Sequence, residues 1–206
     1  MSKGTDKILY QGHGSLRITT AGGKTVYVDP YAGGGYDAPA DLILITHGHG
    51  DHTDQKKIKN RAYDCRVISW KEALAGGKHQ SFDCGFVTVE AVEAGYNRNH
   101  NRENCVVFIL TLPDGISVYI SGDTSKTTQM SVLAERKIDY AFFCCDGIYN
   151  MDVDEAAECA ATVGAKHNIP YHMAPGKLFD RARAEKFPAP GRLIVAAGEE
   201  IELIKE

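Results

Sequence analysis

The segment 46–54, with the sequence THGHGDHTD, gathers three histidines and two aspartates directly after an apolar run. Side chains alternate in an extended chain, so His47 and His49 point the same way from the end of a strand and can share one metal ion. The glycine after His49 lets the backbone bend, so that Asp51 and His52 face a second position nearby. This spacing predicts a dinuclear metal centre.

Two metal ions need more ligands than one loop supplies, and the ends of other strands offer candidates. His100 precedes an apolar run, Asp123 follows one in a Ser-Gly-Asp-Thr sequence, and His172 follows a shorter one. An exposed loop is the alternative interpretation for His100, and a turn with a helix cap is the alternative for Asp123. His79 competes with His100, but its Gly-Gly-Lys-His context predicts a turn that leads into a strand.

Four further residues are weaker candidates. Asp29 is expected to hold a ligand histidine through its other ring nitrogen, or else to cap a turn. His13 is expected to reach the substrate or the metal loop, or else to bond only to backbone. Cys145 and Asp146 end an apolar run and are candidates for lining the pocket, although a packed thiol is the favoured interpretation of Cys145.

The elements that must position these residues are short strands separated by Gly, Pro and Asp turns. The predicted strands are Lys7–Gln11, Ser15–Thr19, Thr25–Asp29, Asp41–Thr46, Arg66–Trp70, Phe86–Ala91, Cys105–Leu112, Ile116–Ser121, Arg192–Ala197 and Glu200–Leu203. The predicted helices run from Thr53 or Asp54 to about Asn60, from Thr124 or Ser125 to about Arg136, onward from a cap at Asp152, and over Lys177–Lys186. Strands mixed with helices predict an α/β or α+β fold in which helices cover sheet layers.

The composition and net charge of the chain limit which binding partners are expected. The chain has 206 residues, 43% of them hydrophobic, which predicts one domain over 1–206. A net charge of −4 with scattered basic residues makes nucleic acid an unexpected partner, and no apolar run approaches the roughly 18 residues of a membrane span. A cytoplasmic location, a small-molecule substrate and, as an option, a homo-oligomer are therefore expected. The six cysteines lack C-x-x-C spacing, which predicts reduced and mostly buried thiols.

The four ligand candidates of the first loop also complete the pattern H-x-H-x-D-H, and His100, Asp123 and His172 follow it in order. In these motifs the chain resembles the metallo-β-lactamase-fold hydrolases. The segments 12–15 (GHGS) and 28–31 (VDPY) are similar to the branch that includes sugar-phosphate lactonases. The resemblance spans most of the chain and implies a four-layer αββα sandwich.

The resemblance also implies how the ligands divide. His47, His49 and His100 would hold the first metal; Asp51, His52 and His172 would hold the second; and Asp123 would bridge them. Histidine and carboxylate ligands suit Zn²⁺, with Mn²⁺ or Fe²⁺ as alternatives. Two ions about 3.5–4 Å apart lower the pKa of a bridging water to about 7, and the hydroxide is the expected nucleophile. Asp51 is the expected catalytic residue, which takes up or passes on the proton.

The leading functional prediction is a metal-dependent hydrolase of a small, anionic lactone, phosphodiester or amide. A compact nuclease or phosphodiesterase is the nearest alternative, and the acidic charge balance disfavours it. A redox diiron protein is disfavoured by His49, because relatives of that kind resemble H-x-E-x-D at this motif. A non-catalytic metal-binding domain is disfavoured by the complete ligand set.

Overall fold

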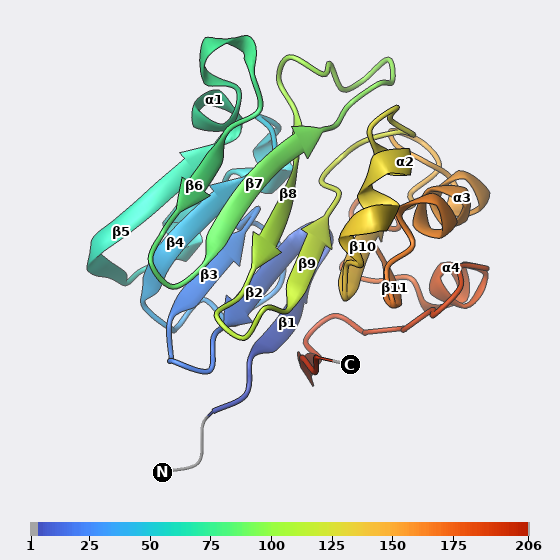
Figure 1. Cartoon of the computed structure of the whole chain (residues 1–206). Coiled ribbons are helices and arrows are strands. Elements are labelled where there is room, and N and C mark those ends of the chain that lie inside the picture. Colours follow the sequence, from blue (N-terminus) through green and yellow to red (C-terminus); the bar gives the residue numbers. More distant parts are fainter. Residues whose placement is uncertain (1–3, 206) are drawn as a thin grey trace.

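The computed structural model describes residues 4–205 and contains two six-stranded sheets packed face to face (Figure 1). In spatial order the first sheet consists of β12 (Glu200–Glu202), β1 (Lys7–Gly12), β2 (Ser15–Thr19), β3 (Thr25–Val28), β4 (Ala40–Ile45) and β5 (Arg61–Ser69). The second consists of β11 (His167–Tyr171), β10 (Tyr140–Cys144), β9 (Ser117–Ile120), β8 (Val106–Thr111), β7 (Thr88–Glu93) and β6 (Ser81–Asp83).

Each sheet is mixed. Strands β3, β4 and β5 are parallel, as are β9, β10 and β11, and the remaining pairs are antiparallel. The carboxyl ends of the two parallel sets meet at one edge, where the amide of Val106 donates to Thr46 O and the amide of His172 donates to His13 O, each over 3.0 Å. This edge brings loops that are far apart in the sequence to one place.

The core lies between the sheets and follows the two-residue period of the strands. On β4, Leu42 and Leu44 face the central core, whereas Ile43 and Ile45 join an outer cluster with Tyr27, Tyr36, Ala40 and Ile58. The apolar run before the metal loop is therefore a strand buried on both faces, which fixes the position of the loop that follows it.

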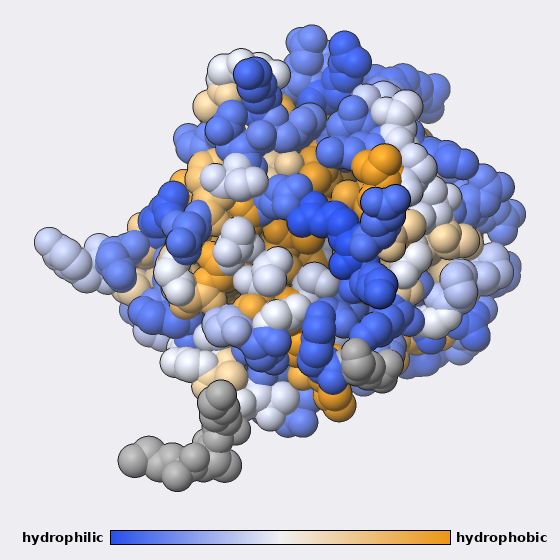
Figure 2. All heavy atoms as spheres, in the orientation of Figure 1, coloured by the Kyte–Doolittle hydropathy of each residue, from blue (hydrophilic) through white to orange (hydrophobic). Residues whose placement is uncertain are grey.

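Short helices complete the layers. They are α1 (Trp70–Ala73), α2 (Met130–Leu133), α3 (Val153–Val163) and α4 (Arg181–Glu185), with 3₁₀ turns η1 (Gly50–His52), η2 (Gln55–Lys57), η3 (Ala75–Gly77) and η4 (Ala134–Arg136). In Figure 1, α2, α3 and α4 lie on the β10 and β11 side. Figure 2 shows that this side is mostly hydrophilic, while hydrophobic side chains reach the surface mainly in the middle of the face. No helix among residues 4–205 has the length and apolar character that a bilayer span requires.

The helix after Asp152 is confirmed. Asp152 caps α3 by accepting from the amide of Glu155 over 2.8 Å, and the buried face of α3 consists of Ala156, Ala157, Cys159, Ala160 and Val163. Glu155 does not complete a reciprocal capping box, because its side chain accepts from the amide of Lys126 over 3.0 Å.

Three other helix predictions are too long. After Asp54 there is only the turn η2, because the Ile58 side chain packs in the outer cluster and the Lys57 ammonium donates to the carbonyls of Tyr31 and Gly33. The helix predicted from residue 124 starts at Met130, because the preceding amides bond to Gly95 O, Glu155 and Glu93 instead. The helix predicted over 177–186 is reduced to α4, which Asp180 caps.

Strand predictions also need two corrections. Within the described residues, 192–197 form no strand and contribute only a single bridge between Arg192 and Asn168. Strand β5 ends at Ser69, whose hydroxyl and backbone form a capping box with Glu72, so Trp70 begins α1 instead of ending a strand.

Candidate metal centre

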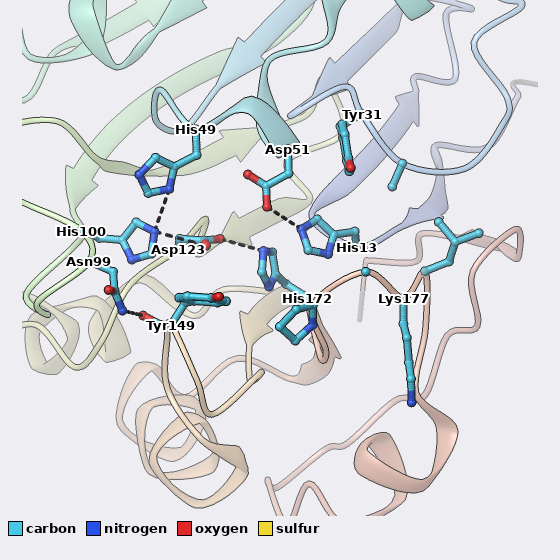
Figure 3. A pocket seen from close by; sticks show the side chains of 14 residues that line it. His13, Tyr31, His49, Asp51, Asn99, His100, Asp123, Tyr149, His172 and Lys177 are labelled. Carbon is cyan, nitrogen blue, oxygen red and sulfur yellow. Dashed lines mark hydrogen bonds and ion pairs between the residues drawn. The ribbon is translucent and has the colours of Figure 1, made fainter.

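A cavity of 470 Å³ opens where the carboxyl ends of the parallel strands meet (Figure 3). Five of the predicted ligands line it: His49, Asp51, His100, Asp123 and His172. His47 and His52 are buried beneath them. The structure therefore brings all seven predicted ligands to one place.

The first group of potential ligands consists of His47, His49 and His100. Each offers a ring nitrogen, and these nitrogens lie within 4.8 Å of one another. His100 Nε2 is 3.2 Å from His49 Nδ1, and His100 itself is buried, so the exposed-loop interpretation of His100 is wrong. His79, the competing candidate, is exposed and borders a different cavity.

The second group consists of Asp51, His52, His172 and, in addition, His13, with potential ligand atoms again within 4.8 Å of one another. His13 Nε2 lies 3.0 Å from Asp51 Oδ2, and the His13 ring centroid is 3.8 Å from that of His172. His13 thus reaches the metal loop, one of the two places that the sequence offered for it.

Asp123 lies between the two groups. Its Oδ1 is 3.4 Å from both His52 Nε2 and His172 Nε2, and its Oδ2 is 3.4 Å from His100 Nε2. Two ligand atoms that each lie about 2.0–2.1 Å from a tetrahedral zinc ion are about 3.4 Å apart. The spacing around Asp123 is therefore that of ligand atoms arranged about a metal ion.

In three of the buried ligand candidates, His47, His52 and His100, the second ring nitrogen faces a hydrogen-bond partner. Thr46 Oγ1 donates to Asp29, so it accepts from His47 Nδ1 at 3.0 Å. Asp29 Oδ2 is 2.9 Å from His52 Nδ1. Asn97 Oδ1, which also accepts from the His100 amide, is 3.1 Å from His100 Nδ1. Bonds of this kind fix the orientation and tautomer of metal-ligating histidines and leave Nε2 as the ligand atom.

At His172 the neighbour of the second ring nitrogen is Asp146, at ion-pair distance and without a hydrogen bond. It is fully buried, and its Oδ2 lies 3.5 Å from His172 Nδ1. Its Oδ1 accepts from the amides of Ile148 and Tyr149, each over 2.7 Å. The amide group of Asn150 donates both to Asp146 Oδ2 (2.7 Å) and to Asp123 Oδ2 (2.8 Å). Asp146 and Asn150 therefore connect His172 to Asp123 without lining the cavity.

The remaining weak candidates, Asp29 and Cys145, are both buried and do not line the cavity. Asp29 belongs to a third group with His47 and His52, but both its oxygens already accept from Thr46, so it fits a positioning role better than a ligand role. Cys145 is fully buried, and its thiol contacts Tyr171 O at 3.7 Å. The packed-thiol interpretation of Cys145 therefore agrees with the structure, and a pocket-lining role does not.

At two glycines of the site the backbone lies too close to another side chain to carry a Cβ atom. A Cβ at residue 14 would lie 2.7 Å from the His52 ring, and a Cβ at residue 122, where φ is +55°, would lie 2.7 Å from Thr46 Cβ. Only glycine fits at Gly14 and Gly122, which explains the glycines beside His13 and Asp123.

The pKa values of the buried histidines His47 and His52 are shifted in opposite directions. Burial and the neighbouring His52 lower the pKa of His47 to about 2, so its ring is neutral. Burial alone would lower the pKa of His52, but the charges of Asp123 and Asp29 raise it to about 9. The hydrogen bond from His13 lowers the pKa of Asp51, and the surrounding histidines lower that of Asp123 in spite of its burial. Both carboxylates are ionised at neutral pH.

The centre fits divalent metal ions. Five buried atoms of the ligand residues lack a hydrogen-bond partner: His172 Nδ1 lies 3.5 Å from Asp146 Oδ2, and the other four are His47 Nε2, His52 Nε2, His172 Nε2 and Asp123 Oδ1. An unpaired buried polar atom costs about 1–3 kcal/mol, and these four belong to the residues grouped around Asp123. Coordination would satisfy each of them, and imidazole and carboxylate are common ligands of such ions.

Comparison with known proteins gives three informative matches. The sequence profile of the beta-lactamase superfamily domain matches residues 7–172. A protein of Geobacillus thermodenitrificans (strain NG80-2), described as a UPF0173 metal-dependent hydrolase, is 33% identical over 194 residues, which cover 81% of this chain and 84% of that protein. The crystal structure of Igni18, a metallo hydrolase from Ignicoccus hospitalis KIN4/I, has a TM-score of 0.75 at 18% identity and covers 98% of this chain and 100% of that one.

Proposed function

Because the chain belongs to the beta-lactamase superfamily and to its UPF0173 family of metal-dependent hydrolases, we propose that it hydrolyses a small molecule at a dinuclear metal centre. His47, His49 and His100 would hold one ion, Asp51, His52 and His172 would hold the other, and Asp123 would be shared. Zinc is the proposed metal, with manganese or iron as alternatives.

The observation that carries this proposal is the position of Asp123. Its two oxygens face different histidines at the same 3.4 Å separation, Oδ1 toward His52 and His172 and Oδ2 toward His100. A carboxylate that offers one oxygen to each of two ligand groups is suited to bridge two ions. A single ion at the second group would use only Oδ1 and would leave the three-histidine group around Oδ2 without an ion.

The chain's own residues would handle the proton. Bound ions would supply hydroxide at neutral pH and polarise the oxygen of the electrophile. Asp51 is ionised, lines the cavity and is held by His13 at 3.0 Å, so it is placed to accept the proton that water loses. The proposed substrates are a lactone, an amide or a phosphodiester, and none of them requires a serine or cysteine nucleophile.

Metal content per chain tests the proposal directly. We expect about two equivalents of zinc, manganese or iron in protein purified without chelator, and a loss of metal in His47→Ala. His79→Ala is the matched control, because His79 lies outside both ligand groups and should keep the full content. One equivalent in the wild type after reconstitution, or equal lactone, amide and phosphodiester hydrolysis by wild type and His47→Ala, would overturn the dinuclear mechanism.

A further inference from the structure

Beyond the ligand groups, the cavity has an apolar wall. Its large apolar side chains are Tyr31, Tyr149 and Leu178, and we call the two tyrosine rings, which flank the cavity on different sides (Figure 3), the aromatic wall. The exposed fractions of the three residues are 44%, 50% and 49%, so each presents about half of a large side chain to solvent. Ligand pockets typically combine such apolar walls with a few polar groups that orient the reacting atoms.

The first tyrosine of this wall is held in place. The amide of Tyr31 donates to Ser15 Oγ (3.1 Å) and to the Tyr36 hydroxyl (3.0 Å). Its carbonyl accepts from the Lys57 ammonium over 2.7 Å. These three bonds restrain the backbone at Tyr31 in spite of the run of glycines at 33–35 that follows.

The second tyrosine is restrained from the other sheet. The amide of Tyr149 donates to the buried Asp146 over 2.7 Å, and its carbonyl accepts from Asn99 over 3.1 Å. Figure 3 shows Tyr31 on the side of Asp51 and His13, and Tyr149 on the side of Asp123. Because these bonds hold the backbone of both tyrosines, a ligand that packs on their rings loses less binding energy to ordering the two loops.

The positive charges near the wall are directed elsewhere. Lys177 is the basic side chain among the lining residues, but its ammonium pairs with Asp180 at 3.1 Å and its side chain runs away from Asp123 and His172 (Figure 3). Arg183 donates to the carbonyls of Cys145 and Asp146, and the Arg181 guanidinium lies 5.6 Å from the centre of the Phe179 ring. Among the described lining residues, no lysine or arginine is therefore free to pair with an anionic group at the wall.

From these contacts we infer that the substrate is a neutral carbonyl compound with an aryl group, which packs against the aromatic wall while the carbonyl carbon faces the ligand groups. This inference rests on the proposed hydrolase function and replaces the expectation of an anionic substrate. In the reaction, the oxygen of water forms a bond to the carbonyl carbon, the bond from that carbon to the leaving oxygen or nitrogen breaks, and the leaving atom takes up a proton.

Binding of six-membered lactams, whose amide bond is far more resistant to hydrolysis than a lactone ester, tests the wall apart from turnover. The probes for the metal-loaded protein are 3,4-dihydroquinolin-2-one, which carries a fused aryl ring, δ-valerolactam, which lacks it, and the 6-carboxylate of the first, which adds a negative charge. We expect the neutral aryl lactam to bind best in calorimetric titrations. Tyr31→Ala and Tyr149→Ala should each weaken its affinity by about two- to tenfold and leave δ-valerolactam unchanged.

Two controls define the effect. Tyr149→Phe should keep the affinity, because the ring face and not the hydroxyl makes the contact, and Tyr63→Ala should have no effect, because Tyr63 is fully exposed on β5 away from the cavity. Tighter binding of the carboxylate, equal binding of the two neutral lactams, or wild-type affinity in both wall variants would overturn the inference.

The reactive analogue dihydrocoumarin separates this inference from the proposed function. Aryl-dependent lactam binding without metal-dependent hydrolysis of dihydrocoumarin would support the wall and count against the hydrolase proposal. Hydrolysis of lactones with no preference for the aryl ring would keep the hydrolase proposal and overturn the aromatic wall.

Discussion

Replacement of Asp29 by asparagine isolates the support beneath the metal centre. Asp29 is fully buried and contacts three groups: its Oδ1 accepts from the Thr46 amide (2.7 Å), and its Oδ2 accepts from Thr46 Oγ1 (2.6 Å) and faces His52 Nδ1 (2.9 Å). In Asp29→Asn the amide oxygen can still accept from the Thr46 amide. The amide nitrogen cannot accept from Thr46 Oγ1 or from His52, so two buried donors lose their acceptor.

The size of the effect follows from these lost contacts. Loss of the partner that orients a ligand histidine typically lowers metal affinity by about 10–100-fold, or about 1.4–2.7 kcal/mol. Each unpaired buried donor costs about 1–3 kcal/mol, so the metal-free variant should also be less stable than the metal-free wild type. Because His47 depends on Thr46, the variant should weaken both ligand groups.

The assay is competition for zinc with a chromophoric chelator, together with urea denaturation of the metal-free proteins. Asp54→Asn is the matched control, because it removes the same charge two residues after His52 from a side chain that makes no capping hydrogen bond. Equal zinc affinity of Asp29→Asn and Asp54→Asn would refute the argument that Asp29 acts by holding His52.

Three further predictions concern other parts of the chain. Asp123→Asn should lower metal content and hydrolysis together, whereas Asp114→Asn, in the β8–β9 turn, should change neither; retention of both by Asp123→Asn would remove Asp123 from the centre. Asp139 is fully buried, and although burial alone would raise its pKa, bonds from Lys205, Ser117 and Lys166 lower it. The ionised Asp139 carboxylate therefore stabilises the fold at neutral pH, and this contribution is lost as the pH falls below about 3.9 toward the folded pKa. Asp139→Asn should lower the free energy of unfolding in urea by about 2 kcal/mol at pH 7 and by less in acid. Equal losses at both pH values would contradict this. Burial raises the pKa of Cys145 to about 12, and four of the six cysteines are buried, so a thiol reagent should titrate at most two thiols in the native protein and all six after unfolding.

The parts of the site that the sequence predicts are those set by local geometry. His47, His49, Asp51 and His52 follow one strand, and their relative directions depend on strand alternation and one glycine bend, which the sequence encodes directly. The predicted family and the two-sheet fold are confirmed. Asp29, predicted to hold a ligand histidine, lies against His52 because β3 and β4 are adjacent parallel strands.

The parts that the sequence did not reveal depend on how loops fold back. Asn97 lies in a turn in which its Oδ1 accepts from the amides of Asn99 and His100 and from His100 Nδ1. This oxygen orients the His100 ring only because the turn lies beside the metal centre, which the sequence alone does not show. Asn150 stands two residues before the helix cap Asp152, but its bonds to Asp123 and Asp146 join the loops that follow β9 and β10, which only the fold brings together. The shortened helices have the same cause, because tertiary hydrogen bonds compete with helical ones at residues 124–129 and at Lys57.

Backbone strain and unpaired atoms coincide at the metal centre. Five non-glycine residues of the described chain have positive φ, and three of them are His13 (51°), Asp29 (45°) and His172 (46°). Such conformations cost about 1–3 kcal/mol each and persist only where surrounding structure enforces them. Here the enforcement comes from two sheets whose parallel strands end at one edge, with the His13 carbonyl bonded to the His172 amide across that edge. The same contacts that enforce these strained conformations hold the imidazoles around Asp123. The strain lowers the free energy of unfolding, and in return the ligand atoms are already in place before a metal ion binds.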